Sequence, residues 1–366
     1  MKTIDLRSDT LTLQDANMLN EMLQAQVGDD CYGEDETVIK LEKYVADLFN
    51  KEAALFVNSG TLSNQIAIRS LIEPGDEIIL DQSYHINFFE AAQTSALSGA
   101  ALNPRVTLDG ILRVEDVIEA VESRARWSSN YAVPRLIVVE NTINGHAGKV
   151  FPYEELIKLY QYARENSMQL HMDGARLFNA CVATGIRPDQ YASYTDTVTF
   201  CFSKGLGAPF GSMLIGDAKL IAKARKARKW YGGALHQAGY LAAAAHYSLI
   251  NNLERLSKDH ENARILYSKF SRLKSIDVLK PDTNIVIVDI SRLCISANAF
   301  VKEAELRGVK LLKWTEKQIR FITSLNNTKD EVLKASDIIA DIVRRYQPGV
   351  EKSCKVYPFK KLGSAS

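Results

Sequence analysis

Cysteine is scarce in this chain of 366 residues, and its five cysteines lie far apart. Cys31, Cys181, Cys201, Cys294 and Cys354 form no C-x-x-C pair. Disulfide-stapled domains and zinc modules depend on several closely spaced cysteines. The sequence therefore predicts neither a disulfide framework nor a metal site, and it favours a reducing, cytoplasmic location.

The chain also lacks an excess of either charge and any long apolar run. Its 45 basic and 44 acidic residues give a formal net charge of +1, so no polybasic surface for nucleic acid or lipid is indicated. No segment has the roughly 18 uncharged apolar residues of a membrane-spanning helix. Charges at Lys2, Asp5, Arg7 and Asp9 occupy the start, where a signal peptide needs apolar residues. We expect no nucleic-acid or membrane partner and no export.

What the chain does have is a series of short apolar runs that alternate with amphipathic segments. Runs of this length suit strands that are covered on both faces, and they lie at residues 53–57, 77–81, 135–140, 169–173, 198–202 and 212–216. Apolar residues at helical spacing predict helices within residues 38–49 and 151–168. This alternation predicts an α/β fold with a mostly parallel central sheet.

The pattern changes near residue 217, where long helical segments begin. Two further predicted strands, at 283–290 and 317–323, flank a predicted helix at 298–308. We therefore expect a large domain over residues 1–250, which includes the N-terminal segment, and a small α+β domain over residues 251–366. The last residues, 356–366, are expected to fray.

Polar residues follow the predicted strands at four places, and ligands of a mostly parallel sheet bind at the carboxyl ends of its strands. At the first place, Ser59, Gly60 and Thr61 separate a strand from a helix. They form either a phosphate cradle of hydroxyls and free N–H groups or a simple helix cap. At the second place, His85 follows the strand 77–81 and is either a structural ring or a proton shuttle.

The third and fourth places are Asp173 and Lys204. Asp173 ends a strand and is either a cap for the next turn or a charged group with a function. Arg176 is close enough in sequence to reach the same pocket. Lys204 stands between an apolar run and a glycine-rich loop. Its amine either extends into solvent or, held in a pocket, loses its proton and forms a Schiff base. The glycine spacing of this loop, G-x-G-x-x-x-G, fits neither a dinucleotide fingerprint nor a Walker A loop.

One cofactor needs all four features in a single site. Pyridoxal 5'-phosphate (PLP) needs helix N–H groups for its phosphate, an acid for its ring nitrogen and a lysine for its aldehyde. The sequence therefore predicts a PLP enzyme, in which Asp173 keeps the ring nitrogen protonated so that the ring accepts electrons from a carbanion.

Five stretches make the chain similar to the threonine aldolases of the β-eliminating lyase family: IDLRSDT, VGDDCYGEDETV, NSGT, HMDGARLFNA and SKGLGAPFGS. With weaker matches further on, the resemblance spans residues 4 to about 323. It implies the PLP-dependent transferase-like fold known as fold type I. It also implies retro-aldol cleavage of a β-hydroxy-α-amino acid, of the L-threonine or L-allo-threonine type, to glycine and an aldehyde.

The resemblance further implies roles for individual residues in binding the cofactor. Lys204 would form the Schiff base, Asp173 would hold the ring nitrogen, and Arg176 would lie near the phenolic oxygen and the substrate. Residues 59–61 would hold the phosphate. His85 would stack on the ring and position water or a hydroxyl group.

On the substrate side, the resemblance implies that Ser8 and Arg320 clamp the α-carboxylate, a group that suits the planar fork of arginine. Tyr32 would complete the substrate site. Lys229 would reach the cofactor from a neighbouring subunit, so that active sites are shared within a homodimer or homotetramer.

Several substrate-side positions depart from the family pattern. Ile143 and Ser324 stand where the family usually has histidines, and His236 replaces an arginine. Residues 123–134 lack a histidine that many members place near the substrate side chain. These departures keep alternatives open: a PLP-dependent β-eliminating lyase or transaldolase, and a non-catalytic binding protein that retains the fold.

Overall fold

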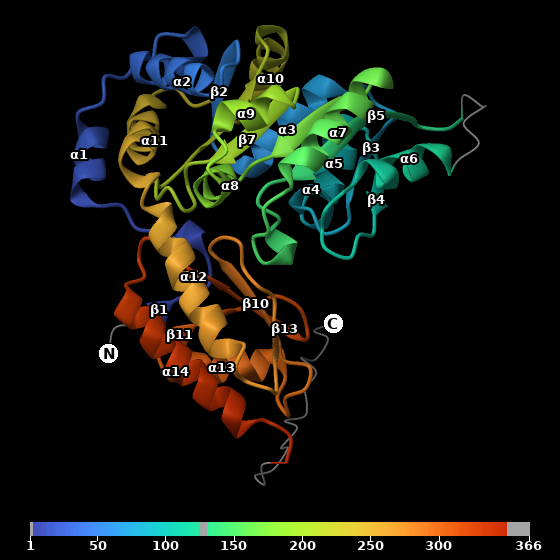
Figure 1. The fold of residues 1–366 in the computed structure, drawn as a ribbon. Coiled ribbons are helices and arrows are strands. Elements are labelled where there is room, and N and C mark those ends of the chain that lie inside the picture. Colours follow the sequence, from blue (N-terminus) through green and yellow to red (C-terminus); the bar gives the residue numbers. More distant parts are fainter. Residues whose placement is uncertain (1–2, 124–129, 350–366) are drawn as a thin grey trace, which may run out of the picture.

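The computed structural model describes residues 3–123 and 130–349, which form a large and a small lobe joined by the long helix α12 (Leu256–Phe270) (Figure 1). The large lobe is built on a seven-stranded sheet with the order β2-β8-β7-β6-β5-β3-β4. Its strands are β2 (Ala53–Val57), β3 (Asp76–Asp81), β4 (Ala101–Arg105), β5 (Val133–Glu140), β6 (Gln169–Asp173), β7 (Thr197–Cys201) and β8 (Ser212–Gly216). All neighbouring strands are parallel except the two pairs that involve β8. The predicted α/β fold with a mostly parallel sheet is therefore confirmed.

Helices flank this sheet and bury its faces (Figure 1). The helices of the large lobe are α1 (Ala16–Leu23), α2 (Glu36–Leu48), α3 (Gly60–Leu71), α4 (His85–Phe88), α5 (Ala91–Ser98), α6 (Val114–Glu122), α7 (Tyr153–Glu165), α8 (Leu177–Thr184), α9 (Pro188–Ser193), α10 (Ala218–Trp230) and α11 (Gly239–Asn252), of which α1 packs on α11. Residues 136–139 of β5 expose none of their surface. Each such aliphatic side chain contributes about 1.5–3 kcal/mol by burial, which is why the central strands read as continuous apolar runs.

The seven-stranded sheet contains one strand, β4, that the sequence did not predict. Strand β4 pairs in parallel with β3 at the edge of the sheet, although its sequence, ALNPR, is neither continuously apolar nor alternating. Pro104 cannot donate a ladder hydrogen bond, and an edge strand is where a sheet tolerates it. Tertiary pairing outweighs weak local propensity here.

The small lobe contains a four-stranded antiparallel sheet with the order β12-β13-β10-β9. Its elements are β9 (Asp277–Val278), β10 (Ile285–Asp289), α13 (Ala297–Leu306), β12 (Leu312–Lys313), β13 (Gln318–Ile322) and α14 (Lys329–Arg345). Strand β1 (Ile4–Asp5) pairs with β11 (Val309–Lys310), and Ile4 and Leu6 join the core of this lobe. The domain boundary at residues 250 and 251 stays a prediction, and the predicted frayed end, 356–366, lies outside the described residues.

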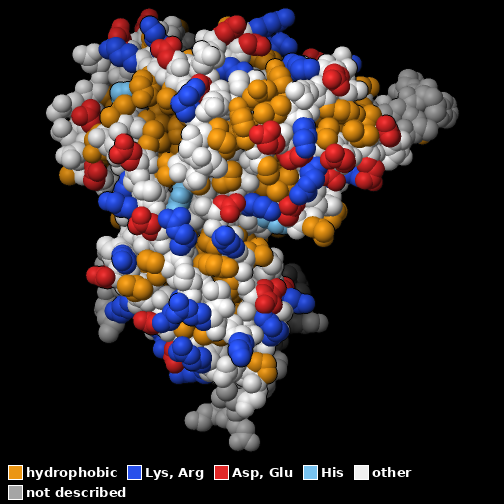
Figure 2. Space-filling view, viewed as in Figure 1, with side chains coloured by type: hydrophobic (Ala, Val, Ile, Leu, Met, Phe, Trp, Pro, Cys, Tyr) orange, Lys and Arg blue, Asp and Glu red, His pale blue; other side chains and the backbone are white. Residues whose placement is uncertain are grey.

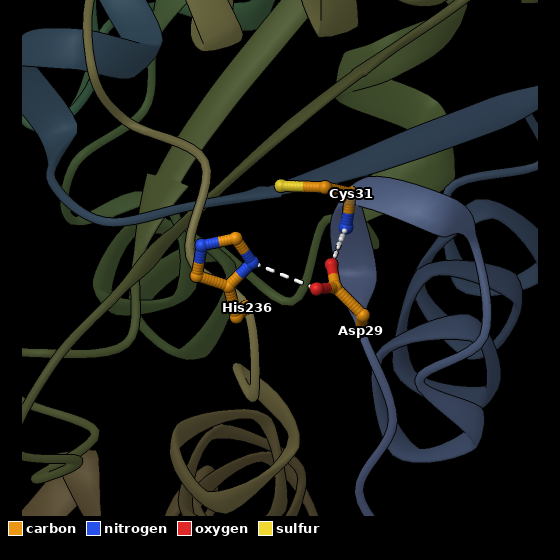
Figure 3. Close-up of side chains that lie close together, drawn as sticks. All are labelled: Asp29, Cys31 and His236. Carbon is orange, nitrogen blue, oxygen red and sulfur yellow. Dashed lines mark hydrogen bonds and ion pairs between the residues drawn. The ribbon is translucent and has the colours of Figure 1, made fainter.

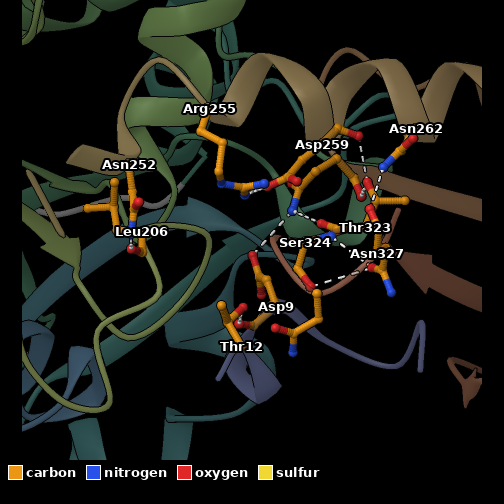
Figure 4. Close-up of polar contacts among 12 residues, drawn as sticks. Asp9, Thr12, Leu206, Asn252, Arg255, Asp259, Asn262, Thr323, Ser324 and Asn327 are labelled. Carbon is orange, nitrogen blue, oxygen red and sulfur yellow. Dashed lines mark hydrogen bonds and ion pairs between the residues drawn. The ribbon is translucent and has the colours of Figure 1, made fainter. Parts of the chain in front are cut away.

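Polar side chains make hydrogen bonds near the junction of the two lobes (Figure 4). Asn252 Nδ2, at the end of α11, donates to the carbonyl of Leu206 over 2.7 Å. Thr323 Oγ1, just after β13, donates to the carbonyl of Asp259 on α12 over 2.6 Å. Arg320, on β13, itself donates to Asn144 Oδ1 of the large lobe over 2.9 Å, and this bond crosses between the lobes.

The distribution of charged side chains on the surface agrees with the near-equal numbers of acidic and basic residues in the sequence. On the face shown in Figure 2, acidic and basic side chains are interspersed on the large lobe, and neither sign covers it alone. Within residues 3–123 and 130–349, no helix combines the length and apolar character needed to cross a membrane.

Candidate active site

The carboxyl ends of β2, β5, β6 and β7 open into one cavity of about 230 Å³ in the large lobe. These strands point the same way, because β5, β6 and β7 are parallel and both β2 and β7 run antiparallel to β8. The predicted residues that line this cavity are Ser59, Gly60, Thr61, His85, Asp173, Arg176 and Lys204. The fold thus brings together side chains from separate parts of the chain.

Lys204 lies in the tight loop between β7 and β8 and faces the cavity. Backbone bonds close the loop: Gly207 N donates to Lys204 O over 2.9 Å, and Phe202 N donates to Gly211 O over 3.0 Å. Gly211 has a φ of 101°, and an added Cβ would lie 2.6 Å from the ring of Phe56. The loop therefore needs glycine at residue 211 to present the lysine at the strand ends.

The segment after β2 forms the start of helix α3. Ser59 is its N-cap, and Ser59 Oγ accepts a hydrogen bond from Leu62 N over 3.2 Å. The first N–H groups of a helix have no intrahelical acceptor, so those of Gly60 and Thr61 are available to an anion in the cavity. A Cβ on Gly60 would lie 2.7 Å from Cys201 Sγ, so only glycine fits there without a shift. The segment serves both as a helix cap and as a potential phosphate cradle.

Asp173 ends β6 and exposes only 2% of its surface. Its Oδ2 accepts from Asn64 Nδ2 over 2.8 Å, and its Oδ1 accepts from Ala175 N over 3.0 Å. The Asn64 amide in turn contacts His171, whose pKa burial lowers to about 4, so that this ring is neutral. Within residues 3–123 and 130–349, Asp173 forms no ion pair with lysine or arginine. The carboxylate is held in place by neutral groups and can accept a cationic partner from the cavity.

His85 begins α4 and is positioned by a buried acid. His85 Nδ1 lies 2.6 Å from Oε1 of Glu90, which exposes 1% of its side chain. Burial alone lowers the pKa of His85, but the bond to Glu90 and the charges of Asp173 and Glu140 raise it overall. Gln65 Nε2 holds the other oxygen of Glu90 over 2.8 Å. The ring is thus fixed at the cavity and titrates above its ordinary range.

Glu140, at the end of β5, is a functional candidate that the sequence analysis missed. It lines the cavity with 3% exposure, and its Oε1 accepts from Asn144 N over 2.7 Å. Burial, together with the charge of Asp173, raises the pKa of Glu140 to about 7. Glu140 ends an apolar strand, as Asp173 does, so the pattern that indicated Asp173 could also have identified Glu140.

Two arginines lie beside the cavity, and they differ in whether an acidic residue pairs with them. Arg176 makes a bidentate ion pair with the buried Asp9, with distances of 2.8 and 2.7 Å. Arg320 donates to Asn144 Oδ1 over 2.9 Å and stacks 4.4 Å from the ring centroid of Trp314. Burial and the neighbouring Arg176 lower the pKa of Arg320 to about 10, and no acidic residue among those described forms an ion pair with it. Arg320 is therefore a buried cation available to an incoming carboxylate.

The remaining predicted site residues do not line the cavity of this chain. Ser8 caps a short 3-10 helix, η1 (Asp9–Leu11), and accepts from Thr10 N over 3.2 Å. Tyr32 is 79% exposed, and the exposed Lys229 lies 3.2 Å from Cys31 Sγ. Their predicted roles stay predictions.

The residues around the cavity fit the chemistry of PLP. They supply an amine, a buried carboxylate and open helix N–H groups, which match the aldehyde, ring nitrogen and phosphate of that cofactor. Two further buried atoms of lining residues, Asn58 Oδ1 and Thr142 Oγ1, have no hydrogen-bond partner within residues 3–123 and 130–349. A polar group bound in the cavity would give these two buried atoms the hydrogen-bond partners that buried polar atoms nearly always have.

The chain is similar in sequence to proteins of one known family. The family described as beta-eliminating lyase matches residues 5–292. The low specificity L-threonine aldolase of Escherichia coli K12 is 37% identical over 334 residues, covering 91% of this chain and 97% of that protein. The probable low-specificity L-threonine aldolase 2 of Arabidopsis thaliana is 40% identical over 296 residues, covering 79% of this chain and 82% of that protein.

The fold is also that of a solved structure. The threonine aldolase of Leishmania major superimposes with a TM-score of 0.80 at 22% sequence identity, and the match covers 93% of this chain and 99% of that one. At this identity the likeness bears on the fold, and it confirms the predicted fold type I architecture.

Proposed function

This chain belongs to the β-eliminating lyase family and, within it, to the threonine aldolases, and we propose that it cleaves L-threonine-type β-hydroxy amino acids at the cavity around Lys204. The products would be glycine and an aldehyde. The observation that carries the proposal is that Lys204, Asp173 and the N-terminus of α3 line one cavity.

The cavity residues would hold PLP by complementary chemistry. Lys204 would bond the aldehyde carbon, Asp173 would bind the protonated ring nitrogen, and residues 59–61 would bind the phosphate. When bound, PLP supplies an electron sink for the charge left when the Cα–Cβ bond breaks. Asn64 and Ala175 keep the Asp173 carboxylate at a fixed position, so its orientation does not depend on the ligand.

The substrate would be oriented by Arg320 and activated by His85. Arg320 carries a buried positive charge, and no acidic residue in the described part of the chain forms an ion pair with it, which suits the α-carboxylate. Within the described part of the chain, His85 is the one histidine that lines the cavity. Position 143, where the family usually has a histidine, holds the fully buried Ile143, and the nearby His146 packs against Gly110. His85, oriented by Glu90, would accept the proton from the β-hydroxyl group.

The pH dependence of the wild-type protein should report the titration of His85. Its pKa is raised, so its neutral, proton-accepting form is present at high pH and is lost as the pH falls through that raised value. We expect kcat to decline on the acid side, and His85→Gln to lower kcat about 100-fold and remove this acid limb. Profiles of kcat between about pH 5 and 9 test this. An acid limb that persists unchanged in the variant would assign it to Glu140, whose pKa is about 7.

Arg320→Lys should weaken substrate binding more than it slows the chemical step. A lysine keeps the charge but loses the planar fork and the stacking on Trp314. We expect KM for the amino acid to rise about 10- to 100-fold, as for the loss of charge-assisted hydrogen bonds worth about 1.5–3 kcal/mol. Arg292→Lys, at an exposed ion pair with Asp277, is the matched control and should leave KM unchanged. An unaltered KM in Arg320→Lys would remove this residue from the substrate site.

Chemical trapping tests where the cofactor binds. The protein is loaded with PLP, reduced with borohydride and digested, and the modified peptide is identified by mass spectrometry. The proposal expects the pyridoxyl label on Lys204 alone. A label on another lysine, or no label after loading, would contradict it.

We further propose that the protein acts in the cytoplasm as a homodimer or homotetramer. Tyr32 and Lys229 are exposed and lie away from the cavity of their own chain, so they could complete a site only in another copy. Light scattering coupled to gel filtration measures the mass in solution, and a monomer at working concentration would refute the shared site.

A further inference from the structure

Three side chains with metal-ligating atoms meet in the large lobe, and none of them lines the cavity around Lys204. Asp29 and Cys31 lie at the start of the short 3-10 helix η2 (Asp30–Tyr32), and His236 lies in the loop between α10 and α11 (Figure 3). One ligand atom from each residue lies within 4.8 Å of the other two. Within residues 3–123 and 130–349 this is the one group of three His, Cys, Asp or Glu side chains with such spacing.

The two chain segments that carry these residues are held together without an ion. Asp30 N donates to the carbonyl of His236 over 2.8 Å, and Cys31 N donates to Asp29 Oδ1 over 2.8 Å. The carboxylate of Asp30 forms a 2.6 Å ion pair with Arg228, and each of these side chains is only 4% exposed. Although Asp29 and His236 are 207 residues apart in sequence, their backbones have a fixed separation. Ion binding would therefore cost little ordering of the chain.

The nitrogen, sulfur and oxygen ligand atoms of the cluster favour one class of metal ion. His236 Nδ1 lies 2.7 Å from Asp29 Oδ2, and Cys31 Sγ lies close to both side chains (Figure 3). Imidazole, thiolate and carboxylate are the ligands of Zn²⁺, whereas Mg²⁺ and Ca²⁺ require oxygen ligands. We propose that Asp29, Cys31 and His236 bind a transition-metal dication of the Zn²⁺ type, with water in the fourth position.

The adjustments that binding requires are small and local. Bonds of about 2.0–2.3 Å to a tetrahedral ion place its ligand atoms roughly 3–4 Å apart, so atoms within 4.8 Å need only side-chain movement. Within its own chain the side chain of His236 is 74% exposed, so no described residue of that chain prevents the small rotation that binding needs. Lys229 Nζ, 3.2 Å from Cys31 Sγ, must withdraw, and it too is exposed. The thiol gives its proton to solvent, because the thiolate is the ligand.

Titration of the PLP-loaded protein with Co²⁺ tests the site, since Co²⁺ replaces Zn²⁺ and reports thiolate ligation by its charge-transfer absorbance. Difference spectra should show this absorbance in the wild-type protein, and added Zn²⁺ should abolish it. Cys31→Ser should remove the absorbance. His236→Gln should weaken Co²⁺ binding about 100-fold or more, since loss of outer-shell partners alone costs about 10- to 100-fold.

Two matched variants separate this site from other ligands on the chain. Cys294→Ser and His246→Gln alter an exposed cysteine and an exposed histidine outside the cluster, and both should bind Co²⁺ as the wild type does. A thiolate absorbance that survives in Cys31→Ser, or that is missing from the wild type, would overturn the proposal. So would equal weakening by His236→Gln and His246→Gln. None of these readouts depends on turnover, so the metal site and the proposed activity fail or succeed separately.

Discussion

Replacing Lys204 with alanine is expected to abolish turnover of L-threonine, with a fall in kcat of about 10⁴-fold or more. Loss of one member of a catalytic unit costs nearly as much as loss of the whole unit, and a covalent lysine is such a member. Lys204 faces the cavity from a loop closed by its own backbone bonds, and no other lysine of the described chain lines that cavity. No second amine is therefore placed to take over its role.

The measurement is the initial rate of aldehyde release by the PLP-saturated variant, followed with a coupled dehydrogenase. Lys223→Ala, which removes an exposed lysine on α10, is the control and should retain wild-type activity. Thermal unfolding of both variants checks that neither is misfolded. If Lys204→Ala retained a tenth of the wild-type rate, the covalent role of Lys204 would be refuted.

Asp173→Asn is expected to lower kcat by about 10²- to 10⁴-fold, the range found when a positioned acid or base is lost. The amide is nearly isosteric, and its oxygen can still accept the bond from Asn64 or Ala175. It cannot, however, stabilise a protonated ring nitrogen by charge. The loss should therefore appear in kcat while the fold is retained.

Steady-state kinetics at saturating PLP separate this effect from weaker cofactor binding, which is measured by fluorescence titration. Asp189→Asn alters a surface ion pair with Arg187 and serves as the matched control. A wild-type kcat in Asp173→Asn would show that ring-nitrogen protonation does not depend on this residue.

The arrangement of the cavity followed from the sequence because parallel strands share one carboxyl edge. Once residues 53–57, 169–173 and 198–202 were predicted as strands, Ser59, Asp173 and Lys204 had to lie near that edge. The strands themselves were recognisable because both faces are buried and the runs are continuously apolar.

Partners that depend on tertiary packing could not be predicted in the same way. Asn64 and Glu90 lie within helical or loop sequence, and their bonds to Asp173 and His85 arise only when the elements pack. Asp9 reaches Arg176 across 167 positions of sequence. Local patterns contain no information on such pairs, because each residue alone is an ordinary polar residue.

The candidate metal cluster illustrates the same limit. The sequence predicted no metal site because its cysteines are not paired, whereas the cluster combines one cysteine with a carboxylate and a histidine from a segment 207 positions away. Spacing rules detect ligands on one short segment, and they miss sites assembled by the fold.

Product analysis tests the central claim most directly. The PLP-loaded protein is incubated with L-threonine, and glycine, acetaldehyde, ammonia and 2-oxobutanoate are quantified together. Retro-aldol cleavage by the cavity around Lys204 predicts glycine and acetaldehyde in equal amounts, with neither of the other products. Ammonia and 2-oxobutanoate in place of glycine would show that the β-hydroxyl group is eliminated, and would contradict the assignment as an aldolase.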